Sequence, residues 1–430
     1  RGNDKMKDLS IDSRDFLNPT RKPSGLDKLA RKVIRARLNE VRQGSISISE
    51  DGATNTVGTV TDAVPLSAHI TIKDPRFYSE VAFGGTIGSG EAFIHDYWEC
   101  DDLTALVRIL LRNQHVLSNL DSGTAMFTRP LQRLFHWLNR NTQEGSRRNI
   151  AAHYDLGNDF YSLWLDPTMM YSSAVFARPD MTLEQASVHK LDLICRKLDL
   201  NASDRVVEIG TGWGGFAIHS AARYGCHVTT TTISKEQHAW AERAIREAGL
   251  EDRITLLLED YRDLEGEFDK LVSIEKNEAV GHDYHDTFFR KCAELLKRDG
   301  QMLIQAITIA DQQYASYKKG VDFIKRYIFP GGCLTSVSGM TETMTRVTDM
   351  RAVHIEDIGP HYATTLKAWR ERFFATLDRV RDLGYSDEFI RMWHYYLAYC
   401  EGGFAERAIG NVHLLVMRPE ARPRLAEDWA

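Results

Sequence analysis

Cysteine is scarce in this chain of 430 residues, and its copies are far apart. None belongs to a CxxC pair or to a cluster with histidines: Cys100, Cys195, Cys226, Cys292, Cys333 and Cys400. Disulfide frameworks and zinc sites need such groupings, so we expect neither, and no metal site. Free thiols fit a reducing compartment, which favours the cytoplasm.

Long apolar runs and an excess of positive charge are also missing. No segment approaches the roughly 18 uninterrupted apolar residues of a membrane-spanning helix, and the first residues, RGNDKMKDLS, lack the apolar core of a signal peptide. We therefore expect neither a transmembrane segment nor export. With 54 Lys and Arg against 60 Asp and Glu, the formal charge of -6 argues against a general nucleic-acid-binding protein.

Apolar residues are plentiful at 43%, which is enough for two or three domains with buried cores. The polar stretch TQEGSRR marks a junction near residue 145. We therefore predict an N-terminal α/β or mostly β domain with its linker at 1–145 and a second domain at 146–430. Residues 45–100 alternate as strands do around glycine-rich turns such as VAFGGTIGSGEAF, and LTALVRILLRN predicts a helix.

Residues 26–41 predict a basic amphipathic helix. Its apolar residues recur at helical spacing, with lysines and arginines between them: Leu26, Leu29, Val33, Ile34, Leu38 and Val41. Such a helix either lies on an anionic bilayer or packs on its own domain with a solvated basic face. A second basic and aromatic helix is predicted at PLQRLFHWLNRN, within 126–148.

After residue 200 the pattern changes, and short apolar runs alternate with helical segments. The runs RVVEIG, CHVTTTTIS, RITLLLED, FDKLVSI and QMLIQAITI predict five strands, and the segments between them predict helices. This alternation is typical of an α/β domain of Rossmann type, with parallel strands covered by helices. Ligands of such sheets bind beyond the carboxyl ends of the strands.

The first of these strands runs into the glycine-rich turn VVEIGTGWGG. Gly210, Gly212 and Gly214 permit a tight turn and a close ligand, and Glu208 precedes them. Dinucleotide enzymes and methyltransferases both use such turns, and a purely structural turn is a third possibility. The second strand ends in TTTTIS and lacks the acidic residue of a nicotinamide site. The motif therefore resembles the S-adenosylmethionine loop of Rossmann-type methyltransferases.

A wider resemblance then becomes visible. HYDLGNDFYSLWLDPTMMYSSAVF, EIGTGWGGFA, TISKEQ, DYRDL, EAVGH, YIFPGGCL and YYLAYCEGGFAER resemble, in order and spacing, the cyclopropane-fatty-acid synthase family. DPRFY and GSGEAFIHDYWECDDL resemble that family's N-terminal module. The resemblance therefore covers most of the chain and predicts a Rossmann-like methyltransferase domain with helical insertions, preceded by a smaller N-terminal α/β domain that associates with lipid or membrane.

The resemblance implies an enzyme that transfers the methyl carbon of S-adenosylmethionine to cis double bonds of unsaturated acyl chains in membrane phospholipids, giving cyclopropane chains. A related C-methyltransferase, giving methyl-branched or methylene-bearing chains, is the alternative. The resemblance also implies a homodimer that lies at the inner membrane surface from the cytoplasmic side. A catalytically silent lipid-binding homologue is a third possibility, but it would be expected to lose Glu278 or the glycine turn, and both are present.

The reaction leaves a carbocation in the acyl chain, which needs aromatic and carboxylate stabilisation, and a base must then remove a proton. The resemblance implies that a bound bicarbonate ion is this base. By motif, its ligands here would be Ser173, Glu278, Gln305, Tyr362 and the carbonyl of Ile307. Ser173 stands where the better-known pattern has Cys, and Gln305 where it has His. Both can still hydrogen-bond an anion. The same two exchanges look like those in the plant-type branch of the family, which also makes cyclopropane rings.

The same motifs imply the cofactor contacts. Tyr171 and Ser172 would meet the methionine end, and Gly210 and Gly212, with Gly214 and Glu208 beside them, would form the cradle. The ribose would be met by Thr232 and Gln237, and the adenine by Tyr261 and Arg262.

Two stretches depart from the pattern or carry unexplained charge. The family usually has a pattern like EMIEAVGH where this chain has EKNEAVGH, so Lys276 and Asn277 replace two apolar residues. A charged Lys276 would repel a sulfonium ion, so we expect it to turn away or to pair with Glu275. The basic and aromatic segment 318–332 suits either a phosphate headgroup or a solvated helix face.

Overall fold

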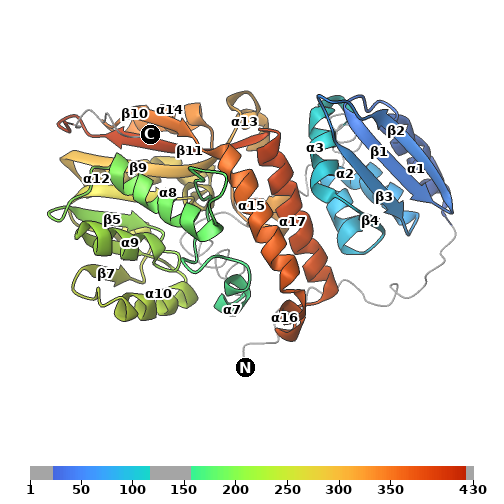
Figure 1. The fold of residues 1–430 in the computed structure, drawn as a ribbon. Coiled ribbons are helices and arrows are strands. Elements are labelled where there is room, and N and C mark those ends of the chain that lie inside the picture. The colour runs from blue at the N-terminus through green and yellow to red at the C-terminus, as the bar shows by residue number, and fades with distance from the viewer. Residues whose placement is uncertain (1–22, 117–155, 423–430) are drawn as a thin grey trace. The chain divides into compact units, whose positions relative to one another are not determined.

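The computed structural model describes residues 23–116 and 156–422, which fall into two compact units (Figure 1). One unit holds residues 23–102 with 113–116, and the other holds 103–112 with 156–422. The predicted junction near 145 and the predicted helix within 126–148 lie outside the described residues. The division at 145 therefore stays a prediction.

The first unit is a small α/β domain, as the sequence predicted. Its four-stranded sheet has the order β2-β1-β3-β4, with β1 antiparallel to β2 and parallel to β3. Its elements are α1 (Gly25–Leu38), β1 (Gly44–Glu50), β2 (Ala53–Thr59), β3 (Ser67–Ile72), α2 (Arg76–Ile94) and β4 (Trp98–Cys100).

The glycine-rich segment VAFGGTIGSGEAF lies inside α2 and therefore forms helix, where the sequence predicted turns. Gly85 breaks the helical geometry with φ 58° and ψ -135°, so α2 bends there. A Cβ on Gly88 would lie 2.0 Å from the carbonyl oxygen of Glu80. These glycines therefore serve a kinked, closely packed helix, which sequence periodicity does not distinguish from a run of turns.

Helix α1 begins at a capping box, in which Ser24 and Asp27 satisfy each other's backbone amides. One face of the helix is buried in its own domain through Ala30, Ile34 and Leu38. A second apolar stripe faces outward: Leu26, Leu29 and Val33 are 52%, 61% and 47% exposed. The helix thus has two apolar faces, and its own domain covers only one of them.

The second unit is built on a seven-stranded sheet of order β10-β11-β9-β8-β5-β6-β7 (Figure 1). The five predicted strands are present and parallel, and β11 and β10 extend the sheet with antiparallel pairing. The strands are β5 (Arg205–Ile209), β6 (His227–Thr231), β7 (Ile254–Leu257), β8 (Phe268–Ile274), β9 (Leu296–Ile309), β10 (Arg351–Asp357) and β11 (Ile409–Met417).

Helices pack on both faces of this sheet, as the alternation predicted. The α-helices of the unit are α3 (Leu103–Arg112), α7 (Asn158–Ser162), α8 (Leu183–Lys197), α9 (Gly215–Tyr224), α10 (Lys235–Glu247), α11 (Asn277–Val280), α12 (His285–Leu295), α13 (Asp311–Tyr317), α14 (Val337–Val347), α15 (Gly359–Ala375), α16 (Leu377–Asp382) and α17 (Asp387–Ala405). One apolar core joins the sheet to α12 and α14, and a second joins it to α8, α9 and α10. Successive residues of β5 serve the two cores, since Val207 belongs to the first and Val206 to the second.

The first turn after β5 depends on left-handed backbone at Gly214, which has φ 93° and caps the N-terminus of α9. Replacing Gly214 with Ala should lower the free energy of unfolding by about 1–2 kcal/mol, because L-residues are strained in this conformation. Chemical denaturation measures the change. Gly320→Ala is the matched control, since Gly320 lies in the same unit and its nearest atoms are 3.9 Å from an added Cβ. Equal stability of the two variants would contradict the argument.

Candidate active site

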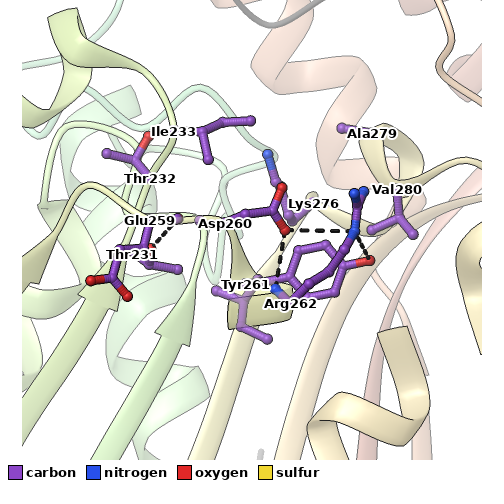
Figure 2. Close-up of a pocket in the computed structure, with 12 residues that line it drawn as sticks. Thr231, Thr232, Ile233, Glu259, Asp260, Tyr261, Arg262, Lys276, Ala279 and Val280 are labelled. Carbon is purple, nitrogen blue, oxygen red and sulfur yellow. Dashed lines mark hydrogen bonds and ion pairs between the residues drawn. The ribbon is translucent and has the colours of Figure 1, made fainter. Parts of the chain in front are cut away.

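A pocket lies beyond the carboxyl ends of β5, β6, β7 and β8, where the sheet topology predicted ligand binding (Figure 2). It is open to solvent on one side and is lined by Ile209, Gly210, Thr231, Thr232, Ile233, Glu259, Asp260, Tyr261, Arg262, Lys276, Ala279 and Val280. Four predicted cofactor residues therefore share one pocket: Gly210, Thr232, Tyr261 and Arg262.

The floor of this pocket is the glycine-rich turn. Gly210 has φ 103°, and its N–H donates to the Thr231 carbonyl at 3.1 Å. Gly212 has φ 54° and open space around the position of a Cβ. A bare, left-handed backbone at the carboxyl end of a parallel strand is the cradle that an adenosyl cofactor needs, so the residues present fit S-adenosylmethionine.

One further predicted residue, Gln237, supports the pocket wall. The Thr232 hydroxyl donates to the Gln237 side-chain oxygen at 3.0 Å, and the Ser234 hydroxyl caps α10 at Gln237. The sequence interpretation missed Asp260, whose carboxylate is buried and accepts the Arg262 N–H at 3.1 Å. Its position at the end of the predicted strand RITLLLED was the available signal.

Lys276 was expected to turn away from the site or to pair with Glu275, and it does neither. Its side chain lies in the pocket beside Asp260 (Figure 2), and a Cβ on Gly210 would be 3.4 Å from Lys276 Cγ. Burial lowers the pKa of Lys276 to about 8, although Asp260 opposes the shift. Burial thus disfavours the charged form of Lys276, and no ion pair with Glu275 compensates for it.

Glu208 and Ser172 are buried near one lysine rather than lining the pocket. Glu208 accepts the Thr230 hydroxyl at 2.6 Å, and burial raises its pKa to about 8. Lys190 donates to the Ser172 hydroxyl at 2.9 Å, and burial lowers its pKa to about 8. Their described contacts support the first strand and the loop around residue 172, and their cofactor roles stay predictions.

The residues predicted to hold an anion converge on Glu275, the first residue after β8. Its Oε1 accepts from the Ser173 N–H at 2.9 Å and from the Gln305 amide at 2.8 Å. Its Oε2 accepts from the Tyr362 hydroxyl at 2.7 Å. The Asn411 amide donates to Oε1 at 2.5 Å, a contact that no sequence motif indicated. The sequence motifs gave Glu275 no role other than that of a possible partner for Lys276.

His413, which Lys197 contacts, fixes the orientation of the Gln305 side-chain amide. Lys197, which pairs with Glu356, donates to His413 Nδ1 at 2.9 Å, so the ring proton is on Nε2. That nitrogen is 3.0 Å from the Gln305 side-chain oxygen and donates to it. Burial, with Lys197 adding to it, holds the pKa of His413 well below its usual value. A neutral histidine therefore turns the Gln305 NH2 group toward Glu275.

The other two predicted anion ligands bond to each other. Glu278 Oε1 accepts the N–H of Ile307, whereas the sequence interpretation used the Ile307 carbonyl. Glu278 Oε2 is buried and has no hydrogen-bond partner among the described residues. Burial first, and then the charge of Glu275, raises the pKa of Glu278 to about 8. The buried amide of Asn277 also lacks a partner in the described part of the chain.

An aromatic cluster adjoins this polar group. The Tyr171 ring lies 5.3–5.5 Å from the rings of Tyr161, Trp164 and Trp369, and its hydroxyl contacts that of Tyr396 at 2.8 Å. Trp369 is also 5.9 Å from the Tyr362 ring. Aromatic faces thus continue from the carboxylate contact at Tyr362 to the predicted cofactor residue Tyr171.

The basic segment 318–332 is only partly available to a ligand. Lys325 is 3% exposed, donates to the carbonyls of Tyr317 and Gly320 at 2.9 Å, and stacks on the Tyr317 ring. It is therefore structural, whereas Lys319 and Arg326 are exposed.

All six cysteines are free thiols. Within residues 23–116 and 156–422, no helix is both long and apolar enough to cross a bilayer, and no acidic, His or Cys cluster is placed to hold a metal.

The fold and pocket define an S-adenosylmethionine-dependent methyltransferase, and comparisons narrow the class. Residues 141–414 match the family model for mycolic acid cyclopropane synthetase. The cyclopropane-fatty-acyl-phospholipid synthase of Escherichia coli strain K12 is 39% identical over 354 residues, covering 80% of this chain and 86% of that protein. Tuberculostearic acid methyltransferase UfaA1 of Mycobacterium tuberculosis is 36% identical over 329 residues, covering 74% and 76%.

Solved structures agree with this assignment. The mycolic acid cyclopropane synthase CmaA1, crystallised with SAH and CTAB, matches at 31% identity with a TM-score of 0.59, over 63% of this chain and 98% of that one. This chain belongs to the mycolic acid cyclopropane synthetase family and is a C-methyltransferase of the fatty-acyl type.

The position of Lys276 generates a prediction for cofactor binding. At pH 7 the Lys276→Met variant should bind S-adenosylmethionine about tenfold more tightly than wild type, because a charged lysine repels the sulfonium. Wild-type affinity should rise as the pH passes about 8 and Lys276 loses its proton, and the gap should then narrow. Titration calorimetry measures both trends. S-adenosylhomocysteine, which has no sulfonium charge, is the control and should show little difference; an equal gain for both ligands would contradict charge repulsion.

Proposed function

We propose that this protein transfers the methyl carbon of S-adenosylmethionine to the cis double bond of unsaturated acyl chains in membrane phospholipids, forming cyclopropane chains. The bound cofactor would supply an electrophilic methyl group. The residues of the pocket would hold its adenosyl part over the glycine turn, through Gly210, Thr232 and Tyr261.

The observation that carries this proposal is the adjacency of an aromatic cluster and a hydrogen-bonded carboxylate. Tyr171, Trp369 and Tyr362 form a run of rings that ends at Glu275. A carbocation in an acyl chain is stabilised by aromatic faces and by negative charge in a dry site. Oxyanion chemistry would require hydrogen-bond donors pointing at the substrate, whereas the donors here already point at a carboxylate.

The residues that the family resemblance assigned to a bicarbonate ion do not fit a separate anion here. Ser173, Gln305 and Tyr362 all donate to Glu275. Because these donors are already bonded to one carboxylate, they cannot hold a second anion at the same place. We therefore assign no step to bicarbonate.

A methyl-branched or methylene-bearing product is the second candidate. The same cation gives these products when a different proton is lost or when hydride moves before deprotonation. The tuberculostearic acid methyltransferase among the relatives favours this alternative, as does the polar pair Lys276 and Asn277 beside the site. The homodimer that the family resemblance implies stays a prediction.

Lipid analysis of a host that expresses the protein separates the candidates. We expect a new acyl species heavier than its unsaturated precursor by one CH2 group, with the retention time of a cyclopropane standard in gas chromatography and mass spectrometry. Label from methyl-labelled methionine should appear in the ring carbon. Label only in branched or methylene chains would support the second candidate, and no labelled acyl chain in the presence of folded protein would refute both.

The exposed stripe of α1 suits a membrane surface. Leu26, Leu29 and Val33 point outward, and Lys28 and Lys32 lie beside them in exposed positions. Apolar residues enter the acyl boundary while lysines meet anionic headgroups. The occupant that this combination of charge and apolar surface fits is an anionic bilayer, which is also where the acyl substrate resides.

Vesicle flotation tests this surface. The double variant Leu29→Glu with Val33→Glu should bind vesicles of phosphatidylglycerol about tenfold less than wild type, because apolar burial is lost and acidic charge is added. Val60→Glu is the matched control, since Val60 is an exposed apolar residue of the same unit at 49%. Unchanged binding of the double variant, or an equal loss in the control, would contradict the assignment to α1.

A further inference from the structure

We propose that the carboxylate of Glu275 is the base of the reaction, built into the chain at the place where the family resemblance predicts a bicarbonate ion. This inference rests on the proposed function, since it assigns a residue to the deprotonation that the reaction requires. It gives Glu275 the role of base that the family resemblance gave to a bicarbonate ion.

Every group that the structure shows hydrogen-bonded to the Glu275 side chain is a donor. Backbone N–H, two amide NH2 groups and a phenol point at its two oxygens from Ser173, Gln305, Asn411 and Tyr362. Three of the four donor residues are completely buried: Ser173, Gln305 and Asn411. A set made only of donors fits an ionised carboxylate, which accepts hydrogen bonds and has none to give.

The backbone of Glu275 shows that this placement is maintained against strain. Its φ of 49° lies in the left-handed region, where a residue other than glycine costs roughly 1–2 kcal/mol. Its N–H is nevertheless fixed at 2.7 Å from the carbonyl of Gln305 on the neighbouring strand. A glycine would satisfy the turn without strain, so the side chain rather than the backbone accounts for the glutamate.

The carboxyl groups of Glu275 and Glu278 have different hydrogen-bonding environments, and this difference gives them different roles. Glu275 has four donors, while Glu278 has one N–H donor and one buried oxygen without a partner. The charge of Glu275 is one reason why the pKa of Glu278 is raised to about 8. Burial and the charge of Glu275 therefore both favour the protonated form of Glu278, which makes Glu278 the weaker candidate for the base.

Glu275 accepts the proton that ring closure releases, and no further reactant is needed. After methyl transfer, a C–H bond of the new methyl group breaks, and its electron pair forms the C–C bond that closes the ring and cancels the cation. The proton goes to Glu275 Oε2, which has one donor, Tyr362, whereas Oε1 has three. Glu275 releases this proton to water before the next turnover.

Turnover on dioleoyl phosphatidylglycerol vesicles, with and without bicarbonate, tests the assignment. Wild type should be equally active in CO2-free buffer and in buffer with added bicarbonate. Glu275→Gln should lose about 100-fold or more of product formation in both buffers, with its affinity for S-adenosylhomocysteine unchanged. Glu275→Asp should recover part of this loss, and Glu247→Gln, an exposed residue of α10, is the matched control and should match wild type.

Glu275→Gly is the decisive variant, because glycine suits the left-handed backbone and leaves four donors without an acceptor. It should be nearly inactive without bicarbonate and gain at least about tenfold when bicarbonate is added. A wild type that needs bicarbonate, or a Glu275→Gln variant with near-normal turnover, would overturn the proposal. So would loss of turnover in Glu278→Gln alone.

A binding measurement keeps this test separate from the proposed function. In 13C NMR, labelled bicarbonate should broaden with Glu275→Gly but not with wild type, whatever lipid the enzyme accepts. Bicarbonate bound by wild type would overturn the Glu275 assignment, even if no phospholipid substrate were found. Active wild type on another lipid, with no bicarbonate bound, would refute the phospholipid proposal and leave the base assignment supported.

Discussion

The hydrogen-bonded carboxylate of Glu275 is the contact on which the arrangement of the site depends. It joins the end of β8 to the loop at Ser173, to β9 through Gln305, to β11 through Asn411 and to α15 through Tyr362. Elements distant in sequence thereby meet at one charged group. A charge that is partly removed from water is stable only when its hydrogen bonds are satisfied, so these five elements must take their places together.

This constraint explains features that are otherwise costly. The left-handed backbone at Glu275 and the buried His413 with Lys197 behind Gln305 are each unfavourable alone. Together they bring the hydrogen-bond donors of the site into contact with the Glu275 carboxylate. The chain places this polar group beside the rings of Trp369 and Tyr171, which gives a cation aromatic faces on one side and negative charge on the other.

The sequence predicted the parallel core of the second unit well, because strand-helix alternation and the glycine turn are local signals. It also predicted Ser173, Gln305 and Tyr362 as one group, through motif resemblance. Asn411 and His413 were missed, since β11 joins the sheet by long-range antiparallel pairing that no local pattern records. The α2 glycines were misassigned because a closely packed helix and a turn both favour glycine. Lys276 was misplaced because electrostatic repulsion was weighed without its burial beside Asp260.

A crystal structure of the protein with S-adenosylhomocysteine, grown in buffer containing bicarbonate, tests the role of Glu275 most directly. Glu275 should still accept from Ser173, Gln305, Asn411 and Tyr362, with no separate planar anion among them. A carbonate-shaped density held by these donors, with the Glu275 side chain turned away, would contradict it.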